Sequence, residues 1–455
     1  MAGTKTKDLT NGPILKNIVK FCLPLMIGNL FQQFYNMADI IIVGQCIDQN
    51  ALSAVGSVGS LNFLVIGSVI GLCTGFTVPV ARCFGAQDFK GLKKYISNII
   101  YATVALALII TVAAVSLTHP LLKMLNTPTD IYQDAYDYIV IIFSGIGATM
   151  LYNILASIVR ALGDSKTPLY FLIFSSILNI CLDLLLIEGF GMRVEGAAIA
   201  TIFSQLVSGV LCLFYVIKKF PILRTTKETR GFDYKCIQRL LINGIPLALQ
   251  FSITAIGSVM LQSCVNGLGV NIIAAVTMGG KTQLMITLPS ETIGATMTVF
   301  CSQNLGAGKI DRIKKGVKRG AALAVGYSII GFLVARYLGP YISLLFVNGE
   351  GNEAVIALAQ QYINMGSFFY PVLSLLFLFR NSIQGLGYSS VAMFAGVFEL
   401  IARAIMGYGF VNTLGYTAAC VANPVAWVAA DLFLIPAYLV IINIIQKKYI
   451  KKHCS

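Results

Sequence analysis

The sequence is poor in charged side chains. Charged residues make up 11% of its 455 residues and hydrophobic residues make up 57%, whereas charged residues are about 25% of an ordinary soluble domain. So few charges cannot cover the surface of a soluble protein of this size, and so apolar a chain is not a disordered one. The scarcity of charge therefore predicts that lipid surrounds most of the chain.

Groups suited to metal or acid–base chemistry are also scarce. The two histidines are His119 and His453, no His-Glu-x-x-His motif occurs, and the 11 cysteines include no Cys-x-x-Cys. Metal sites and disulfide frameworks need such spacings, so we interpret the cysteines as apolar fillers and expect neither enzymatic activity nor a bound cofactor. Residues 279–282, GGKT, resemble the end of a phosphate-binding loop, but Ala275 replaces its first glycine, which argues against an ATP-driven pump.

Long apolar runs dominate the sequence instead. A run of about 18 or more apolar residues is typical of a membrane-spanning helix. The first run is too long for the core of a cleavable signal peptide. The runs predict an all-α membrane protein with twelve transmembrane helices, at residues 18–43, 53–80, 95–117, 133–159, 168–187, 196–217, 239–264, 273–301, 317–337, 355–380, 388–410 and 414–442.

The formal net charge of +14 is distributed unevenly between the loops. One side of the predicted membrane holds Lys123, Arg193 and Arg336, while Lys281 and Arg403 fall inside spans. Every other lysine and arginine falls on the opposite side, including Lys5, Lys7, Arg160, Arg380 and Lys452. Cytoplasmic loops are the basic ones, so both termini are predicted in the cytoplasm of a cell (plasma or inner) membrane. Because the basic residues are confined to loops, we expect them to contact phospholipids, and we expect no nucleic-acid partner.

Three segments of the first half recur in the second. Pro24 matches Pro246, the segment 84–94 (FGAQDFKGLKK) matches 305–315 (LGAGKIDRIKK), and 160–165 (RALGDS) matches 384–389 (QGLGYS). Matches in one order at nearly one offset predict two parallel six-helix lobes, at residues 1–217 and 239–455, joined by a cytoplasmic linker at 218–238. This organisation is typical of an alternating-access transporter, and we expect a monomer. Each proline permits a bend in its helix, or makes a passive kink.

Five acids lie inside predicted spans: Asp39, Asp183, Glu291, Glu399 and Asp431. A carboxylate at the centre of a bilayer costs at least about 2.5–3.5 kcal/mol on insertion scales, so each acid is a candidate functional residue. Glu399 and Arg403 stand one helical turn apart and form a predicted structural or gating pair. Glu291 is a candidate wall residue of a cavity in the second lobe. Asp431 and Lys281 have no partner that the sequence identifies.

The topology brings four polar side chains of the first lobe to one depth. Asp39 lies near the outer end of the first span, Asn179 and Asp183 share one face of the fifth, and Thr201 begins the sixth at a similar level. Their oxygens suit Na⁺, or a proton shared by two carboxylates. The alternative is a structural polar network. Tyr35, one turn inward of Asp39, is a candidate wall residue of the substrate cavity.

Four segments resemble the multidrug and toxic compound extrusion (MATE) family: 32–44 (QQFYNMADIIIVG), 85–94 (GAQDFKGLKK), 160–168 (RALGDSKTP) and 176–205 (SILNICLDLLLIEGFGMRVEGAAIATIFSQ). The resemblance implies two six-helix lobes that export cationic or amphipathic organic compounds, driven by Na⁺ or H⁺. It assigns the cation site to Asp39, Asn179, Asp183 and Thr201, and adds the backbone carbonyl near Ala197. Thr254 stands where sodium-coupled NorM-like members carry a glutamate, and the span 355–380 has no acid. The sequence is thus similar to the DinF-like branch, with coupling in the first lobe.

Other functions remain possible from the sequence. A lipid or lipid-linked oligosaccharide flippase of the same superfamily would share the architecture, but its cavity is expected to carry several cations. Only Lys281 and Arg403 lie inside the predicted spans. A channel is a further alternative, which counterflow of a labelled dye would separate from a carrier.

Overall fold

The structure is a computed structural model that describes residues 8–125, 127–344 and 353–454. Lys5 and Lys7, which contribute to the predicted orientation, lie outside these residues. All regular elements in the described ranges are helical: α1 (Ile14–Cys46), α2 (Gln49–Ser57), α3 (Gly59–Gly85), α4 (Phe89–Met124), α5 (Thr129–Ser144), α6 (Ile146–Ala161), α7 (Lys166–Leu184), η1 (Leu185–Gly189), α8 (Val194–Lys219), η2 (Pro221–Leu223), α9 (Tyr234–Asn266), α10 (Val270–Gly306), α11 (Ile310–Tyr337), α12 (Gly339–Ser343), α13 (Glu353–Ser367), α14 (Tyr370–Gly385), α15 (Ser389–Ala404), η3 (Ile405–Phe410), α16 (Val411–Leu414) and α17 (Tyr416–Cys454).

Ten helices of the described chain are long and apolar enough to cross a membrane, and two bent pairs bring the total to 12. The pairs are α5 with α6, bent by 48°, and α13 with α14, bent by 58°. They coincide with the predicted spans 133–159 and 355–380, so the twelve-helix fold is confirmed. Pro371 lies in the first turn of α14, where its missing N–H costs the helix nothing. The predicted span 53–80 differs, because α2 is a separate short helix before α3.

Acids at the ends of the spans act as helix caps. Asp48 Oδ1 accepts a hydrogen bond from the Ala51 amide at 2.7 Å at the start of α2. Asp88 Oδ1 accepts one from the Gly91 amide at 2.9 Å at the start of α4. Such carboxylates satisfy amides that have no partner within the helix and complement its dipole. Acids in short loops therefore mark where helices begin.

The turns of the repeated segments have matching geometry in the two halves. Gly163 and Gly387, in the third repeated segment, both have φ of 84°. Each donates its amide to a carbonyl three residues earlier, Arg160 O and Gln384 O, at 2.8 Å. In the second repeated segment Gln87 has φ of 56° and Gly308 has φ of 71°. Left-handed backbone at matched positions indicates that the two halves are built on one six-helix plan.

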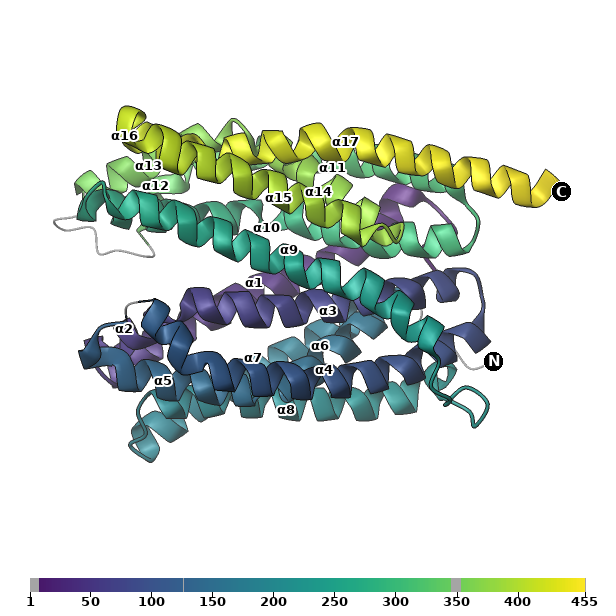
Figure 1. Cartoon of the computed structure of the whole chain (residues 1–455), viewed down its shortest axis with the longest axis horizontal. Coiled ribbons are helices and arrows are strands. Elements are labelled where there is room, and N and C mark those ends of the chain that lie inside the picture. The colour runs from purple at the N-terminus through teal and green to yellow at the C-terminus, as the bar shows by residue number, and fades with distance from the viewer. Residues whose placement is uncertain (1–7, 126, 345–352, 455) are drawn as a thin grey trace. The chain divides into compact units, whose positions relative to one another are not determined.

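The described residues form two compact units, one made of those in 23–252 with Asp8, and the other of 9–22 with those in 253–454. These units do not end where the predicted lobes end, because the boundaries between them fall inside α1 and α9. Both helices are labelled in Figure 1. In the first unit the Asn98 side chain bonds the backbone of Gly231 and Asp233 just before α9. In the second unit the Arg312 guanidinium bonds the carbonyls of Leu9, Asn11 and Gly12 just before α1. The segment before α9 is thus bound to the first unit, and the segment before α1 is bound to the second.

Two glycines of α3 permit close packing on α9 within the first unit. A Cβ atom on Gly75 would lie 2.5 Å from Gly244 Cα, and one on Gly71 would lie 2.8 Å from the Leu247 carbonyl oxygen. Both neighbours are backbone atoms, which cannot move aside as a side chain can. Small residues that allow backbones to approach are a usual means of joining helices in lipid.

Gly75→Ala is therefore expected to lower the free energy of unfolding by about 1–3 kcal/mol, the range for overpacking a filled interior. The matched control is Gly147→Ala in α6, where nothing lies within 4 Å of the added Cβ. Thermal denaturation followed by size-exclusion chromatography in detergent measures both. Equal midpoints for the two variants would contradict the packing argument.

Candidate functional site

Two buried acids meet in the first unit. Asp39 of α1 is 9% exposed and Asp183 of α7 is 0% exposed. Their carboxyl groups interact, and they form a hydrogen bond with each other when one carries the proton. When both are ionised, Asp39 Oδ1 and both Asp183 oxygens are buried without a hydrogen-bond partner. The structure therefore brings together the two acids that the sequence placed at one depth.

Asn179 and Thr201 complete the polar group. Asn179 Nδ2 donates to Thr201 Oγ1 at 3.3 Å, which leaves Asn179 Oδ1 buried without a partner. The Tyr35 hydroxyl also lies 3.3 Å from Thr201 Oγ1. Ala197, fully buried in α8, stands one turn before Thr201. All residues that the sequence assigned to this layer belong to α1, α7 and α8 of one unit.

Asp183 is followed at once by a change in helix type. From Leu185 to Gly189 the backbone is a π-helix, with Phe190 N bonded to Leu185 O at 3.1 Å. π turns inside α-helices occur often at functional sites. A second π-helix, η3, follows Arg403 in the second unit. Neither π-helix interrupts the hydrophobic pattern of the sequence, so neither was predicted.

Tyr138 of α5 is a member of the site that the sequence argument missed. Its buried hydroxyl lies within electrostatic range of Asp39, Asp183 and Tyr35. The missed signal is the string DAYDYIV at 134–140, where a tyrosine follows acids into an apolar span. A buried tyrosine normally finds a polar partner, and here carboxyl groups are at hand.

The donor set suits a hard cation or a proton. Asp39 Oδ1, Asn179 Oδ1 and both Asp183 oxygens lack a donor when the acids are ionised. Buried polar atoms are almost always satisfied, so a group of orphaned oxygens calls for a positive partner. A bound Na⁺ would be coordinated by these oxygens, and a proton would join the two carboxyl groups. Two like charges in a dry site favour binding of either.

A pocket adjoins this group on the side of Tyr35. Its volume is about 90 Å³, and its wall contains Gln32, Tyr35, Tyr152, Arg160 and Gln205 together with leucine and proline side chains. Tyr35 thus contacts both the pocket and Thr201. The sequence proposed Tyr35 as a cavity wall residue but treated Arg160 as a cytoplasmic loop cation. The structure instead places Arg160 in the last turn of α6, partly buried.

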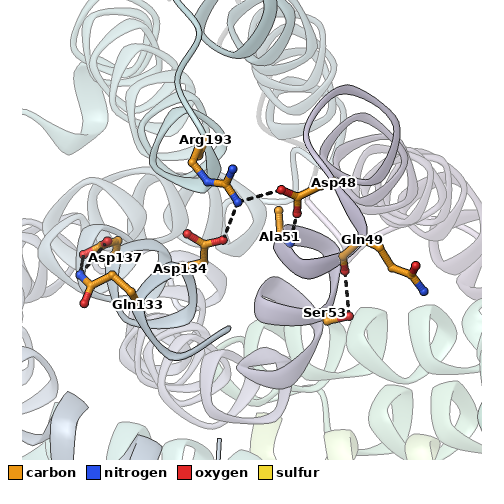
Figure 2. Close-up of polar contacts among 8 residues, drawn as sticks. All are labelled: Asp48, Gln49, Ala51, Ser53, Gln133, Asp134, Asp137 and Arg193. Atoms are coloured by element: carbon orange, nitrogen blue, oxygen red, sulfur yellow. Dashed lines mark hydrogen bonds and ion pairs between the residues drawn. The ribbon is translucent and has the colours of Figure 1, made fainter. Parts of the chain in front are cut away.

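Arg193 joins three segments near the ends of α1, α5 and α8 (Figure 2). Its Nη2 donates to Asp48 Oδ2 at 2.9 Å and to Asp134 Oδ2 at 3.0 Å. The Ala51 amide, followed by the Arg193 guanidinium, lowers the pKa of Asp48 below its ordinary value. The Asp134 and Asp48 carboxylates raise the pKa of Arg193. These contacts hold the loop after α1, the helix that carries Asp39, against α5 and α8.

Asp48→Asn is expected to lower the thermal midpoint by a few degrees at most, equally at pH 6 and pH 8. A lowered pKa means that the stabilisation is complete above the unfolded pKa of about 4 and is lost only as the pH falls through the lower folded value. Asparagine still caps α2, so the variant isolates the charge. Asp137→Asn, whose carboxylate contacts Gln133 rather than a cation, is the control. A larger effect at pH 8 than at pH 6 would show that Asp48 titrates between them.

The second unit holds a buried ion cluster in place of two acids. Arg380 Nη2 donates to Glu399 Oε1. Arg403 Nη2 donates to Glu399 Oε2 at 3.2 Å. All three side chains are buried. Arg403 Nε also donates to Asn423 Oδ1 at 3.0 Å. The predicted Glu399–Arg403 contact is therefore present, and it includes Arg380, which the sequence argument had placed in a loop.

Two of the remaining predicted acids lie within electrostatic range of Arg380. Glu291 is one of them, and it is exposed in α10 although Ser290 and Thr292 beside it are buried. Asp431 of α17 is 6% exposed with Oδ1 unbonded, and it lies within electrostatic range of Arg380. Lys281 is exposed in α10. Pro24 and Pro246 lie inside α1 and α9, and neither ends its helix. The functional roles assigned to these residues stay predictions.

Comparisons with known proteins agree with this architecture. The MatE family model matches twice, at residues 24–185 and 246–409, once in each half. "Probable multidrug resistance protein YpnP" of Bacillus subtilis is 29% identical over 406 residues, 89% of each chain. "Probable multidrug resistance protein NorM" of Thermotoga maritima is 25% identical over 380 residues, 82% of this chain and 80% of that one.

A solved structure described as MATE in complex with MaL6 has the same fold. It superposes with a TM-score of 0.91 at 22% identity, and the match covers 98% of this chain and 100% of that one. The twelve helices, the two acids facing each other in the first unit and the paired family match lead to one conclusion. The chain is a multi-pass membrane protein that belongs to the MatE family of multidrug efflux transporters.

Proposed function

We propose that the chain exports cationic and amphipathic organic compounds from the cell in exchange for Na⁺ or H⁺ that moves inward. Asp39, Asn179, Asp183 and Thr201, with the carbonyl near Ala197, bind the driving ion. The observation that carries the proposal is the set of buried oxygens without donors around Asp39 and Asp183. The relatives YpnP and NorM, each named a probable multidrug resistance protein, support the substrate class.

Tyr35 links the driving ion to the exported compound. Its hydroxyl lies 3.3 Å from Thr201 Oγ1 and its side chain lines the pocket. An ion bound at the two acids changes the charge felt through this contact, so that ion binding and compound binding disfavour each other. Such reciprocal coupling is what exchange by alternating access requires.

Both termini and the linker 218–238 are proposed to face the cytoplasm of a monomeric transporter in the cell membrane. Single cysteines placed in 44–52 are expected to react with an impermeant maleimide added to intact cells, and those in 218–238 are not. Labelling of the linker after the membrane is opened is the control for reactivity. External labelling of the linker would overturn the orientation.

The deciding experiment is export of ethidium from proteoliposomes under separately imposed Na⁺ and pH gradients. Export that follows one gradient identifies the ion, and export under neither would contradict the proposal. Counterflow of labelled ethidium, driven by unlabelled ethidium on the opposite side, separates a carrier from a channel. A lipid flippase is not favoured by the matched family and its relatives.

A further inference from the structure

We propose that a basic pocket of the second unit binds the phosphate group of an anionic phospholipid. The pocket lies between the chain just before α1 and the first turns of α11, and both segments belong to the second unit. Its volume is about 560 Å³, within the range of about 300–1,000 Å³ that is typical of ligand pockets. Among the described residues, its wall carries one acid, Asp311, and four cations: Lys309, Arg312, Lys315 and Arg319. This excess of positive charge calls for an anionic ligand.

The matched position in the first unit carries an acid that the second unit lacks. The repeated segments 84–94 and 305–315 place Lys309 at the position of Asp88. Asp88 caps α4, where its Oδ1 accepts a hydrogen bond from the Gly91 amide at 2.9 Å, whereas the side chain of Lys309 makes no cap at the start of α11. The dipole of a helix favours an anion at its first turn. In the second unit that place is therefore open to an anion from outside the chain.

A second carboxylate is missing in the same way. The offset between the matched prolines of α1 and α9 places Asn11 at the position of Asp233. In the first unit Asp233 forms an ion pair with Lys94. In the second unit Asn11 Oδ1 accepts a hydrogen bond from Lys309 Nζ at 2.7 Å, but the amide brings no charge. The second unit thus keeps the basic residues of this corner without the two acids that accompany them in the first.

Two cations of the pocket wall have no acid beside them. Lys315 stands at the position of Lys94, and Arg319, one turn further along α11, stands at the position of Asn98. In the first unit Lys94 is paired with Asp233, and Asn98 bonds the segment before α9. The side chains of Lys315 and Arg319 are exposed and form no ion pair or hydrogen bond within the described parts of the chain. Because they lie one helical turn apart, both can contact one phosphate group.

The other two cations hold the opposite wall of the pocket in place. Lys309 Nζ donates to the Thr10 carbonyl at 2.9 Å, and the Arg312 guanidinium donates to carbonyls of the segment 9–12. These contacts fix the chain before α1 against the start of α11 without any ligand. A preformed pocket loses less conformational freedom when a ligand binds.

Apolar side chains beside the pocket favour a lipid as the source of the phosphate. Leu15, next to the wall residue Ile14, is 46% exposed at the start of α1. Tyr449 of α17 is 39% exposed and lies against Gly308, which is also in the wall. The acyl chains of a bound phospholipid would contact such side chains, whereas a free phosphate would leave them exposed. The pocket lies at the ends of α1 and α11 that are proposed to face the cytoplasm, where anionic lipids attract lysine and arginine.

The experiment follows the thermal midpoint of the purified full chain in maltoside detergent while dioctanoyl phosphatidylglycerol is added. A ligand that binds the folded chain raises the midpoint with its concentration, which gives an apparent dissociation constant. We expect phosphatidylglycerol to raise the midpoint at concentrations where dioctanoyl phosphatidylcholine and potassium phosphate, at constant ionic strength, do not. An equal effect of phosphatidylcholine would show that no anion is selected, and an equal effect of phosphate would assign the pocket to the free ion. Either result would overturn the proposal.

A double variant removes the two cations that have no acid beside them. Lys315→Gln with Arg319→Gln should raise the apparent dissociation constant for phosphatidylglycerol by about tenfold or more. The lipid-free midpoint should stay unchanged, because neither side chain has a partner to lose. The control is Lys218→Gln with Lys219→Gln, which removes the same charge from exposed positions in the last turn of α8 and should keep the wild-type constant. Equal weakening by the two double variants would mean attraction to any basic surface, and the pocket would be wrong.

A third variant restores a carboxylate to the pocket. Asn11→Asp gives the second unit the acid that the first unit has at Asp233, and it places the new charge beside Lys309. The lipid-free midpoint should not fall, while the apparent dissociation constant for phosphatidylglycerol should rise about fivefold, since one charge of the site is already neutralised. Unchanged or tighter binding of phosphatidylglycerol would contradict the proposal. These measurements need neither an ion gradient nor an exported compound, so their outcome is independent of the proposed transport function.

Discussion

Asp39→Asn and Asp183→Asn are each expected to reduce gradient-driven ethidium export to the rate of protein-free liposomes. Either change removes one of two facing carboxyl groups, and with it the charge that attracts the driving ion into a buried site. The variants should still insert and fold, because asparagine keeps the size of aspartate and removes a like charge. Export from proteoliposomes and elution in size-exclusion chromatography measure both properties.

Two further variants calibrate this result. Thr201→Ala removes one neutral oxygen and should weaken the dependence on ion concentration without abolishing export. Asp130→Asn changes an exposed acid in the first turn of α5 and should leave export unchanged. If either central variant concentrates ethidium at the wild-type rate, the polar group is structural, and Glu291 becomes the next acid to test.

Glu399→Gln is expected to destabilise the second unit severely, because it leaves Arg380 and Arg403 buried beside each other without their shared acid. Removal of one member of a buried pair costs about 3–5 kcal/mol. Arg403→Gln should be milder, since the Glu399–Arg380 pair persists. Thermal midpoints and the yield of folded protein measure the difference.

The three-membered cluster also changes what a double variant should do. Glu399→Gln combined with Arg403→Gln removes the acid bonded to Arg380 and leaves it only the longer-range attraction of Asp431 and Glu291, so the stability of the double variant should lie between those of the two single variants. Glu353→Gln, at an exposed acid in the first turn of α13, is the control and should be neutral. Equal stability of Glu399→Gln and Arg403→Gln would argue against a shared acid.

Much of the fold could be predicted because a bilayer imposes simple rules. Apolar runs of sufficient length become spans, and basic clusters separate them. The meeting of Asp39 and Asp183 could also be predicted, since helix direction and residue count fix the depth of a side chain. The depth of a residue does not say toward which neighbouring helix its side chain points. Tyr138 of α5, which points to the same site, was therefore missed.

The buried arginines show where the rules fail. Arg160 and Arg380 stand at span ends, so counting cations by loop treated them as solvated. In the structure both lie within helices, one in a pocket wall and one bound to Glu399. A long side chain at a helix end can turn inward or toward solvent, and only packing with distant segments decides this. The bends between α5 and α6 and between α13 and α14 were hidden because composition does not record direction.

The two π turns differ in their place within the repeat. A π turn amounts to one residue inserted into an α-helix. Asn179 and Asp183 precede η1 at the same spacing as Glu399 and Arg403 precede η3. Counted from the matched turns at Gly163 and Gly387, however, η1 begins 22 residues later and η3 begins 18 residues later, so the two π turns lie about one helical turn apart in the repeat. The two helices also carry different chemistry before the π turn: buried oxygens without donors in one unit, and a buried ion pair in the other.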